Sequence, residues 1–173
     1  MAIKYIAFVL VAAVVFGLDQ LGKRFVEGSL AIGEHVPLVS GLIGWTYRPE
    51  AGGALGFFRG WAPEAELAGY AVLSFVVLIV SLVFLRSLAP RDFGTTAALG
   101  ALVGGVASNG IDRYRLGSTI DFIHLGPAAS SLLPDFNFAD LAVLLGVGTL
   151  IIELLANEMA ARAAERPRRA PPY

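Results

Sequence analysis

Long apolar stretches, separated by short polar segments, run along nearly the whole chain. Four of them approach the roughly 20 residues that a helix needs to cross the hydrocarbon core of a bilayer. In chain order they are Tyr5–Val26, Leu67–Leu85, Thr95–Ile111 and Phe138–Leu155. The pattern predicts an all-α membrane protein with four membrane-spanning helices.

Two of these stretches depart from a plain apolar helix. Lys4, an apolar run and small residues also fit a secretory signal peptide, but no clear A-x-A cleavage site precedes Asp19. The third stretch contains Gly100, Gly104 and Gly105. Small residues of this kind let transmembrane helices approach closely, so we expect tight packing there.

The segments between the apolar stretches predict the remaining organisation. Residues 28–66 form a long connection, and such loops usually have structure and function. Within it, His35–Tyr47 mixes β-branched and aromatic residues with glycines, which predicts short strands and turns. We expect 117–134 to be irregular. The chain thus divides into a four-span domain, 1–158, and a basic tail, 159–173, expected to be disordered.

Composition narrows the function classes. Of the 173 residues, 56% are hydrophobic and 16% are charged, whereas soluble domains carry about 25% charged residues. Soluble enzymes are therefore excluded, and a net charge of −1 argues against a nucleic-acid partner. The chain has no cysteine and only two histidines, far apart in sequence. We expect no thiol nucleophile, no metal site and no cofactor.

The distribution of basic residues predicts the orientation. With four spans, both termini and the connection between the second and third helices share one side of the membrane. That side carries Lys4, Arg86, Arg91, Arg162, Arg166, Arg168 and Arg169. The positive-inside rule makes it cytoplasmic, so the loops 28–66 and 117–134 face outward.

Charged groups at membrane depth are costly and tend to be functional. Here they gather at the outward ends of the first, third and fourth helices. Asp19 and Lys23 share a helix face at i,i+4, which also fits a local salt bridge. At the end of the third helix, Asn109, Asp112 and Arg113 fall on one side, and the last two could form a structural pair that holds the loop.

Two aspartates stand out because large apolar residues flank them. Asp121 lies in the second outer loop, and Asp140 follows Asn137 at i,i+3 at the start of the fourth helix. A lone Asp140 could simply complement the helix dipole. If the two segments pack together, however, the two carboxyl groups can share a proton near neutral pH. One could then activate water while the other polarises a carbonyl, which is aspartic-protease chemistry.

Four short motifs occur in order along the predicted spans. They are Asp19-Gln20-Leu21-Gly22-Lys23, Gly104-Gly105-Val106-Ala107-Ser108-Asn109-Gly110-Ile111-Asp112-Arg113, Ile120-Asp121-Phe122-Ile123 and Phe136-Asn137-Phe138-Ala139-Asp140. In these motifs the chain resembles the bacterial lipoprotein signal peptidases (signal peptidase II), which are membrane aspartyl endopeptidases.

The resemblance implies a catalytic dyad of Asp121 and Asp140. It implies supporting or substrate-contacting roles for Asp19, Lys23, Asn109, Asp112, Arg113 and Asn137. It also implies a four-helix transmembrane bundle with a small extracytoplasmic β-rich cradle and a short helix from the first outer loop. The substrates would be prolipoproteins, cut before a diacylglyceryl-modified cysteine in the bacterial inner membrane, among membrane lipids. A monomer is expected, because one chain holds both aspartates.

The first outer loop departs from the family pattern. With Tyr47 and Gly52 in register, Glu50 stands where the family usually has Asn. An ionised carboxylate only accepts hydrogen bonds, whereas an amide also donates. A third acid near the dyad could raise the pKa values of the pair, or Arg48 could neutralise it. Glu50 and Gly52 therefore join the candidate site residues.

Two other functions fit parts of this pattern. A subunit of a proton-coupled transporter would also carry buried aspartates, but its polar groups should form a path through several depths. A catalytically silent homologue that only binds lipoproteins would be consistent with Glu50. The clustering of polar residues at the outward ends favours the peptidase.

Overall fold

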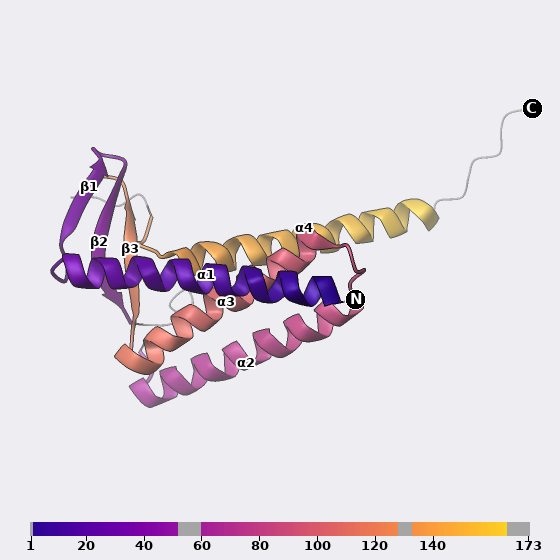
Figure 1. Ribbon diagram of the computed structural model, residues 1–173, viewed down its shortest axis with the longest axis horizontal. Helices are drawn as coiled ribbons and strands as arrows, with labels where there is room; N and C mark the ends of the chain where they lie inside the picture. Colours follow the sequence, from indigo (N-terminus) through magenta and orange to yellow (C-terminus); the bar gives the residue numbers. More distant parts are fainter. Residues whose placement is uncertain (1, 52–59, 128–132, 166–173) are drawn as a thin grey trace, which may run out of the picture.

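The computed structural model describes residues 2–51, 60–127 and 133–165. Over these residues the chain forms a helical body with a small sheet at one end (Figure 1). The helices are α1 (Ala2–Ser29), α2 (Pro63–Ser87), α3 (Phe93–Leu116) and α4 (Phe138–Glu165). The protein is thus a mostly helical membrane protein.

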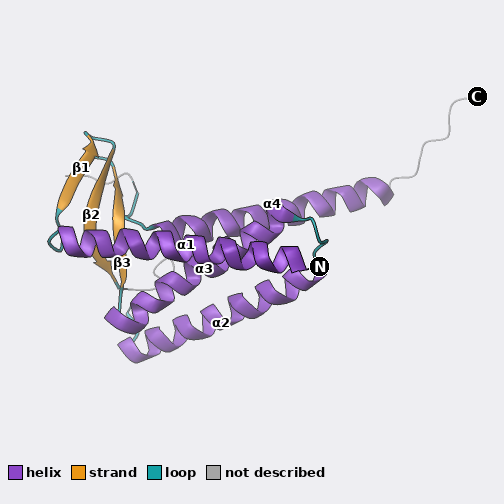
Figure 2. Cartoon of the chain, viewed as in Figure 1, coloured by secondary structure: helices purple, strands orange, loops and turns teal. Residues whose placement is uncertain are grey.

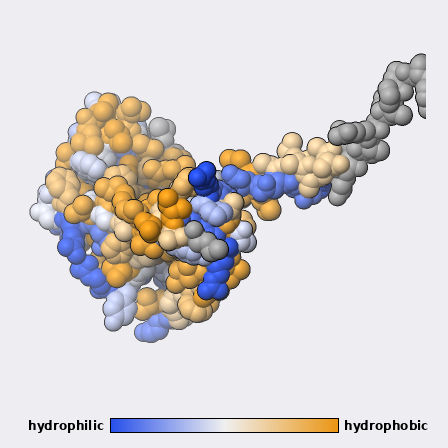
Figure 3. Space-filling model, turned by 45° about the vertical axis from the view of Figure 1, so that its right-hand side comes forward, coloured by the Kyte–Doolittle hydropathy of each residue, from blue (hydrophilic) through white to orange (hydrophobic). Residues whose placement is uncertain are grey.

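Three of the helices, α1, α2 and α4, are long and apolar enough to cross a membrane. Few of their residues are buried within the chain, so their apolar side chains cover much of its surface (Figure 3). Helix α3 is less apolar and packs against the other three helices. The lower hydrophobicity of α3 fits its central position, because this helix contacts protein on several sides.

The glycines of α3 bring its backbone close to its neighbours, as the sequence predicted. A Cβ atom on Gly104 would lie 2.5 Å from the Ala12 carbonyl oxygen of α1. A Cβ atom on Gly105 would lie 2.5 Å from the Ala139 carbonyl oxygen of α4. Real Cβ atoms do not tolerate such distances, so these two glycines set the spacing of α1, α3 and α4.

The sheet is antiparallel, with strand order β1-β2-β3 (Figure 2). Strands β1 (His35–Val39) and β2 (Ile43–Glu50) pair as a hairpin, in the region where the sequence predicted short strands and turns. The third strand, β3 (Thr119–Leu125), corrects the prediction that 117–134 is irregular. Almost all of β3 is buried, so it lacks the alternation of polar and apolar residues that reveals a half-buried strand.

The sheet consequently draws on both loops, and the first outer loop alone does not build it. Between the end of α1 and the start of α2, the described residues of that loop form strands and turns but no helix. The short helix that the family resemblance implied is not seen among these described residues. Residues 52–59, and with them the candidate Gly52, lie outside the described residues.

An aromatic cluster fixes the sheet against the helices. Phe122 of β3 is fully buried and packs with Val26 of α1. Its ring lies 5.7 Å from that of Trp45 and 5.0 Å from that of Phe138, measured between ring centroids. Gly22 of α1 leaves the space that this ring occupies. Since Phe122 directly follows Asp121, the cluster also fixes the position of that carboxyl group.

The opposite end of the body holds the N-terminus. The Lys4 ammonium group donates hydrogen bonds to the carbonyl oxygens of Arg86 and Leu88, at 3.1 and 2.7 Å. The start of α1 thus lies beside the connection between α2 and α3. Helix α4 extends past its neighbours and continues to Glu165 (Figure 1), so the first residues of the expected tail, 159–165, are helical. The remainder of the tail lies outside the described residues.

Candidate active site

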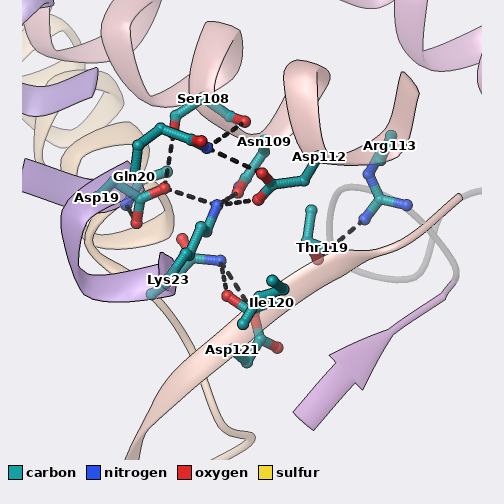
Figure 4. A network of polar contacts seen from close by, with 12 residues as sticks. Asp19, Gln20, Lys23, Ser108, Asn109, Asp112, Arg113, Thr119, Ile120 and Asp121 are labelled. Carbon is teal, nitrogen blue, oxygen red and sulfur yellow. Dashed lines mark hydrogen bonds and ion pairs between the residues drawn. The ribbon is translucent and has the colours of Figure 1, made fainter. Parts of the chain in front are cut away.

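A buried ammonium group organises the polar end of the helical body. Lys23 of α1 is 2% exposed, and its Nζ lies 2.6 Å from Asp19 and 2.5 Å from Asp112 of α3 (Figure 4). The predicted i,i+4 pair is confirmed. The second carboxylate comes from a helix distant in the sequence, and both acids are buried. One cation between two anions compensates charges that would otherwise be very costly to bury.

Two polar residues complete this network between α1 and α3. The Gln20 side-chain amide donates to Ser108 Oγ at 3.0 Å and to Asp112 Oδ1 at 2.8 Å. The Ser108 hydroxyl donates to Asp19 Oδ2 at 2.8 Å (Figure 4). Neither Gln20 nor Ser108 was among the candidate residues. Both lie within the motifs. The available signal was that Gln20 directly follows Asp19 and that Ser108 lies one helical turn before Asp112.

The start of α4 carries a reciprocal cap that involves Asp140. The side-chain oxygen of Asn137 accepts from the Asp140 N–H at 2.9 Å. The Asp140 carboxylate in turn accepts from the Asn137 N–H at 3.2 Å. This is a capping box with Asp in the place of the usual Glu or Gln. Asp19 accepts from the Ala139 N–H at 2.9 Å, so α1 also caps α4.

Asn109 connects the lysine network to Asp140. Its side-chain oxygen accepts from Lys23 at 2.6 Å, and its amide donates to Asp140 Oδ1 at 2.9 Å. Because the oxygen is occupied by a cation, the amide nitrogen must face the Asp140 carboxylate. The network thereby sets the orientation of Asn109 and, through it, one oxygen of Asp140.

Asp121 enters from β3 and reaches the same asparagine that caps α4. The Asn137 amide donates to Asp121 Oδ1 at 2.9 Å and to the Ile120 carbonyl oxygen at 3.3 Å. The side chain of Asp121 is buried. Burial raises the pKa of the Asp121 carboxyl group to about 8, and the negative charges of Asp140 and Glu50 contribute in the same direction. The fold therefore gathers Asp121 and Asp140 around Asn137.

Such an arrangement suits acid–base chemistry. Two carboxyl groups that influence each other cannot easily ionise together, so they tend to hold one proton between them. The ionised member can accept a proton from water, and the protonated member can donate a hydrogen bond to a carbonyl oxygen. The remaining hydrogen-bond partners are amides, which orient the carboxyl groups without themselves titrating.

Arg113 and Asp112 do not pair with each other, which corrects one expectation. Asp112 faces Lys23, whereas the Arg113 guanidinium lies 2.8 Å from Glu66 of α2 and 3.7 Å from Glu50 of β2. Consecutive residues on a helix point about 100° apart, so they reach different neighbours. Glu66 was not a candidate, since its sequence position at the start of α2 gave no sign of this partner.

Arg48 likewise has a different partner from the one considered. Its Nε lies 3.1 Å from Asp135, and it does not neutralise Glu50. Asp135 also contacts His124 Nδ1 at 2.8 Å, and the rings of His124 and His35 pack with centroids 4.6 Å apart. The two histidines are therefore neighbours despite their sequence separation. Among the described residues no cluster of three or more His, Cys, Asp or Glu side chains could hold a metal ion.

Comparison with known proteins assigns the chain to a family. The family model for signal peptidase (SPase) II matches residues 11–156, a segment that contains every candidate residue. The chain belongs to the signal peptidase II family. The lipoprotein signal peptidase of Parasynechococcus marenigrum is 35% identical over 152 residues, which cover 88% of this chain and 91% of that protein. The lipoprotein signal peptidase of Desulforapulum autotrophicum is 29% identical over 150 residues, which cover 87% of this chain and 92% of that protein.

Members of the signal peptidase II family thus resemble this chain over nearly its whole length. Two solved structures, each of a bacterial membrane enzyme, share its fold. One has a TM-score of 0.73 and 26% identity, and covers 86% of this chain and 92% of its own. The other has a TM-score of 0.77 and 24% identity, and the match covers 95% of this chain and 94% of that structure's chain. The overall fold of this chain therefore belongs to a known architecture.

Proposed function

We propose that this chain is an aspartic endopeptidase that removes signal peptides from prolipoproteins, with Asp121 and Asp140 as its catalytic dyad. The observation that carries the proposal is the hydrogen bonding of both carboxyl groups to Asn137. Membership of the signal peptidase II family supports the substrate class.

The dyad acts on one water molecule and one peptide bond. The ionised aspartate removes a proton from water as it attacks the scissile carbonyl carbon, and the protonated aspartate donates a hydrogen bond to the carbonyl oxygen. The proton then passes to the leaving nitrogen as the C–N bond breaks. The two residues titrate as a unit, so the base and acid roles belong to the pair.

The remaining candidates act on the dyad from outside it. Asn109 and Asn137 orient the carboxyl groups, and Lys23 supplies positive charge through Asn109. Asp19 and Asp112 hold Lys23 in place. Arg113 lies at the edge of the site beside Glu50. Gly52 belongs with these supporting residues by its place in the family motif.

We further propose a four-span topology in the bacterial inner membrane, in which α3 spans the membrane together with α1, α2 and α4. Both termini are cytoplasmic, and the sheet and dyad lie near the outer face. The contacts of Lys4 with the connection between α2 and α3 support a shared side for these segments. The substrate carries a diacylglyceryl cysteine and is cut before it, at the level where lipid surrounds the helices. The enzyme acts as a monomer, since one chain supplies both acids.

Cleavage of a lipidated prolipoprotein by the purified protein in detergent tests the proposal. Asp121→Asn and Asp140→Asn should each reduce the rate at least ~100-fold, the scale of acid–base catalysis, while the variants still fold. A metal chelator should leave the rate unchanged. Near wild-type cleavage by either variant would contradict the dyad, and binding without cleavage by the wild-type protein would favour a silent homologue. A transporter would instead need a polar path through the helices.

A further inference from the structure

A second polar cluster joins strands β2 and β3 to the segment that precedes α4. His124 of β3 and Asp135 are both buried, and His124 Nδ1 lies 2.8 Å from Asp135 Oδ1. The other oxygen, Oδ2, lies 3.1 Å from Nε of Arg48 but has no hydrogen-bond partner among the described residues. A carboxylate next to a cation only accepts hydrogen bonds, so His124 Nδ1 donates to Asp135.

The bond between His124 and Asp135 is a firm attachment. A hydrogen bond to a carboxylate is roughly twice as strong as one between neutral groups. Burial strengthens it further, because little water screens it. Nε2 of the same ring lies 3.2 Å from the Pro127 carbonyl oxygen, and the ring packs against that of His35. The imidazole is therefore held on several sides and gives Asp135 a fixed partner.

The segment 135–137 follows β3 as far as Asp121. The Phe136 N–H donates to the Ile123 carbonyl oxygen at 3.1 Å, and the Phe136 carbonyl oxygen accepts from the Ile123 N–H at 2.8 Å. The next residue, Asn137, donates to Asp121 at 2.9 Å. The contacts thus run in order along two antiparallel segments, and they pair His124 with Asp135, Ile123 with Phe136, and Asp121 with Asn137.

The first contact in this series restrains the direction in which the segment approaches α4. The backbone pairing with β3 engages Phe136, as an isolated bridge. A single paired residue fixes a position, but the chain on either side of it can still pivot. Asp135 restrains one side through His124, so the other side, with Asn137, is directed toward Asp121. Since Asn137 contacts both carboxyl groups of the dyad, this restraint bears on their geometry.

We propose that His124 is a positioning residue of this enzyme, which through Asp135 holds Asn137 against Asp121. The inference rests on the proposed function for its effect on catalysis. His124 acts through the segment 135–137 and is not itself a catalytic residue. Its removal should therefore slow the chemical step and leave substrate binding largely intact.

Two amide variants of His124 separate its two ring contacts. Asn carries its amide nitrogen as many bonds from Cβ as Nδ1, so His124→Asn keeps a donor toward Asp135. Gln carries it as far out as Nε2, so His124→Gln keeps the contact with Pro127 instead. We expect His124→Gln to lower kcat about 10-fold with little change in KM, less than the roughly 100-fold effect of a fully misplaced catalytic group.

His124→Asn is the matched control and should retain most of the rate. The two variants have similar size and polarity, so a role in packing alone would not favour the shorter side chain. A wild-type kcat for His124→Gln would overturn the proposal and show that the backbone bridge suffices. Equal losses for the two variants, a reversed order, or a change in KM alone would also overturn it.

Asp135→Ala tests the same contact from its other side. It should lower kcat about as much as His124→Gln, and the two substitutions together should cause little further loss, because both remove one interaction. Additive losses would overturn the proposal. Arg48 is 59% exposed and can return to water, so Arg48→Gln should have a smaller effect than Asp135→Ala. If His124→Gln does not fold, the kcat of Asp135→Ala decides the matter.

The side-chain amide resonance of Asn137 in NMR spectra reports the same geometry without substrate. It should shift in His124→Gln and in Asp135→Ala, and stay near its wild-type position in His124→Asn. Glu64→Gln changes an exposed glutamate of α2 and should leave it in place. If the wild-type protein fails to cleave prolipoprotein, the proposed function falls, whereas this resonance still decides the role of His124. An unmoved resonance in His124→Gln would refute that role.

Discussion

The side-chain amide of Asn137 donates a hydrogen bond to Asp121 over a distance of 2.9 Å, and the same Asn137 caps the helix that carries Asp140. One asparagine thus fixes a strand residue and a helix residue relative to each other. Its oxygen and its nitrogen are both used, so its orientation is determined by the start of α4. The geometry of the two carboxyl groups consequently depends on a residue that does not itself titrate.

Asn137→Ala should therefore reduce cleavage much more than it reduces stability. We expect a rate loss of about 100-fold, since misplacing a catalytic group by an ångström has effects of this size. Loss of the helix cap should cost about 1 kcal/mol of unfolding free energy. Asn157→Ala, at an exposed position on the same helix, is the control and should change neither quantity. A variant with near wild-type cleavage would show that Asn137 does not orient the dyad.

The raised pKa of Asp121 predicts how stability changes with pH. The folded protein retains the proton to about pH 8, whereas the unfolded chain releases it near the ordinary value of 3.8. A group whose pKa is raised on folding stabilises the protein below the lower value, and this contribution disappears as the pH rises through the higher one. Stability should therefore fall between about pH 4 and pH 8.

Asp121→Asn removes this pH dependence because an amide cannot ionise. At pH 8–9 the variant should unfold at a higher temperature than the wild type, by about 2–4 °C for each kcal/mol gained. At pH 4 the two midpoints should be closer together. Thermal unfolding in detergent across this range provides the measurement. A constant difference between the two proteins at all pH values would contradict the raised pKa.

Lys23→Ala should destabilise the protein strongly. The substitution leaves Asp19 and Asp112 buried without the cation between them, and breaking a buried ion pair in this way costs about 3–5 kcal/mol. Arg24→Ala removes a neighbouring charge from an exposed position of the same helix and should have little effect. Unfolding by heat measures both variants. Equal stabilities for the two would mean that Lys23 is not the centre of the network.

Two α3 glycines should not tolerate a methyl group. Gly104→Ala and Gly105→Ala would press a Cβ atom against the backbone of α1 and α4, respectively, and should each cost about 1–3 kcal/mol. Gly17→Ala is the matched control, because no atom lies within 4 Å of a Cβ at that position of α1. It should be neutral or slightly stabilising, by up to about 1 kcal/mol. A destabilising effect confined to Gly17→Ala would contradict this packing.

The sequence predicted features that depend on neighbours within one helix. The spacing of Asp19 and Lys23 predicted their ion pair, and that of Asn137 and Asp140 predicted a shared place at the start of α4. The glycines of the third apolar stretch predicted close helix packing. In each case the repeat of the helix places the residues together, so distant parts of the chain do not alter the prediction.

Other features depended on contacts between distant segments and were missed. Strand β3 exists because β2 pairs with it, and its burial on both faces hides the period of two. The partners of Arg113 come from α2 and β2, so its neighbour Asp112 gave no information about them. Glu66 and Ser108 became site residues only through such contacts.

The sequence by itself determined the membrane class, the hydrophobic helices and the residue types available for chemistry, because composition and local periodicity specify these. Only the tertiary structure decided that Asp121 and Asp140 share Asn137, that Lys23 lies between Asp19 and Asp112, and that Arg113 pairs with Glu66. These relationships depend on how the four helices and β3 pack around buried charges. A charge taken out of water needs a partner, and the packed structure determines which side chain is near enough to provide it.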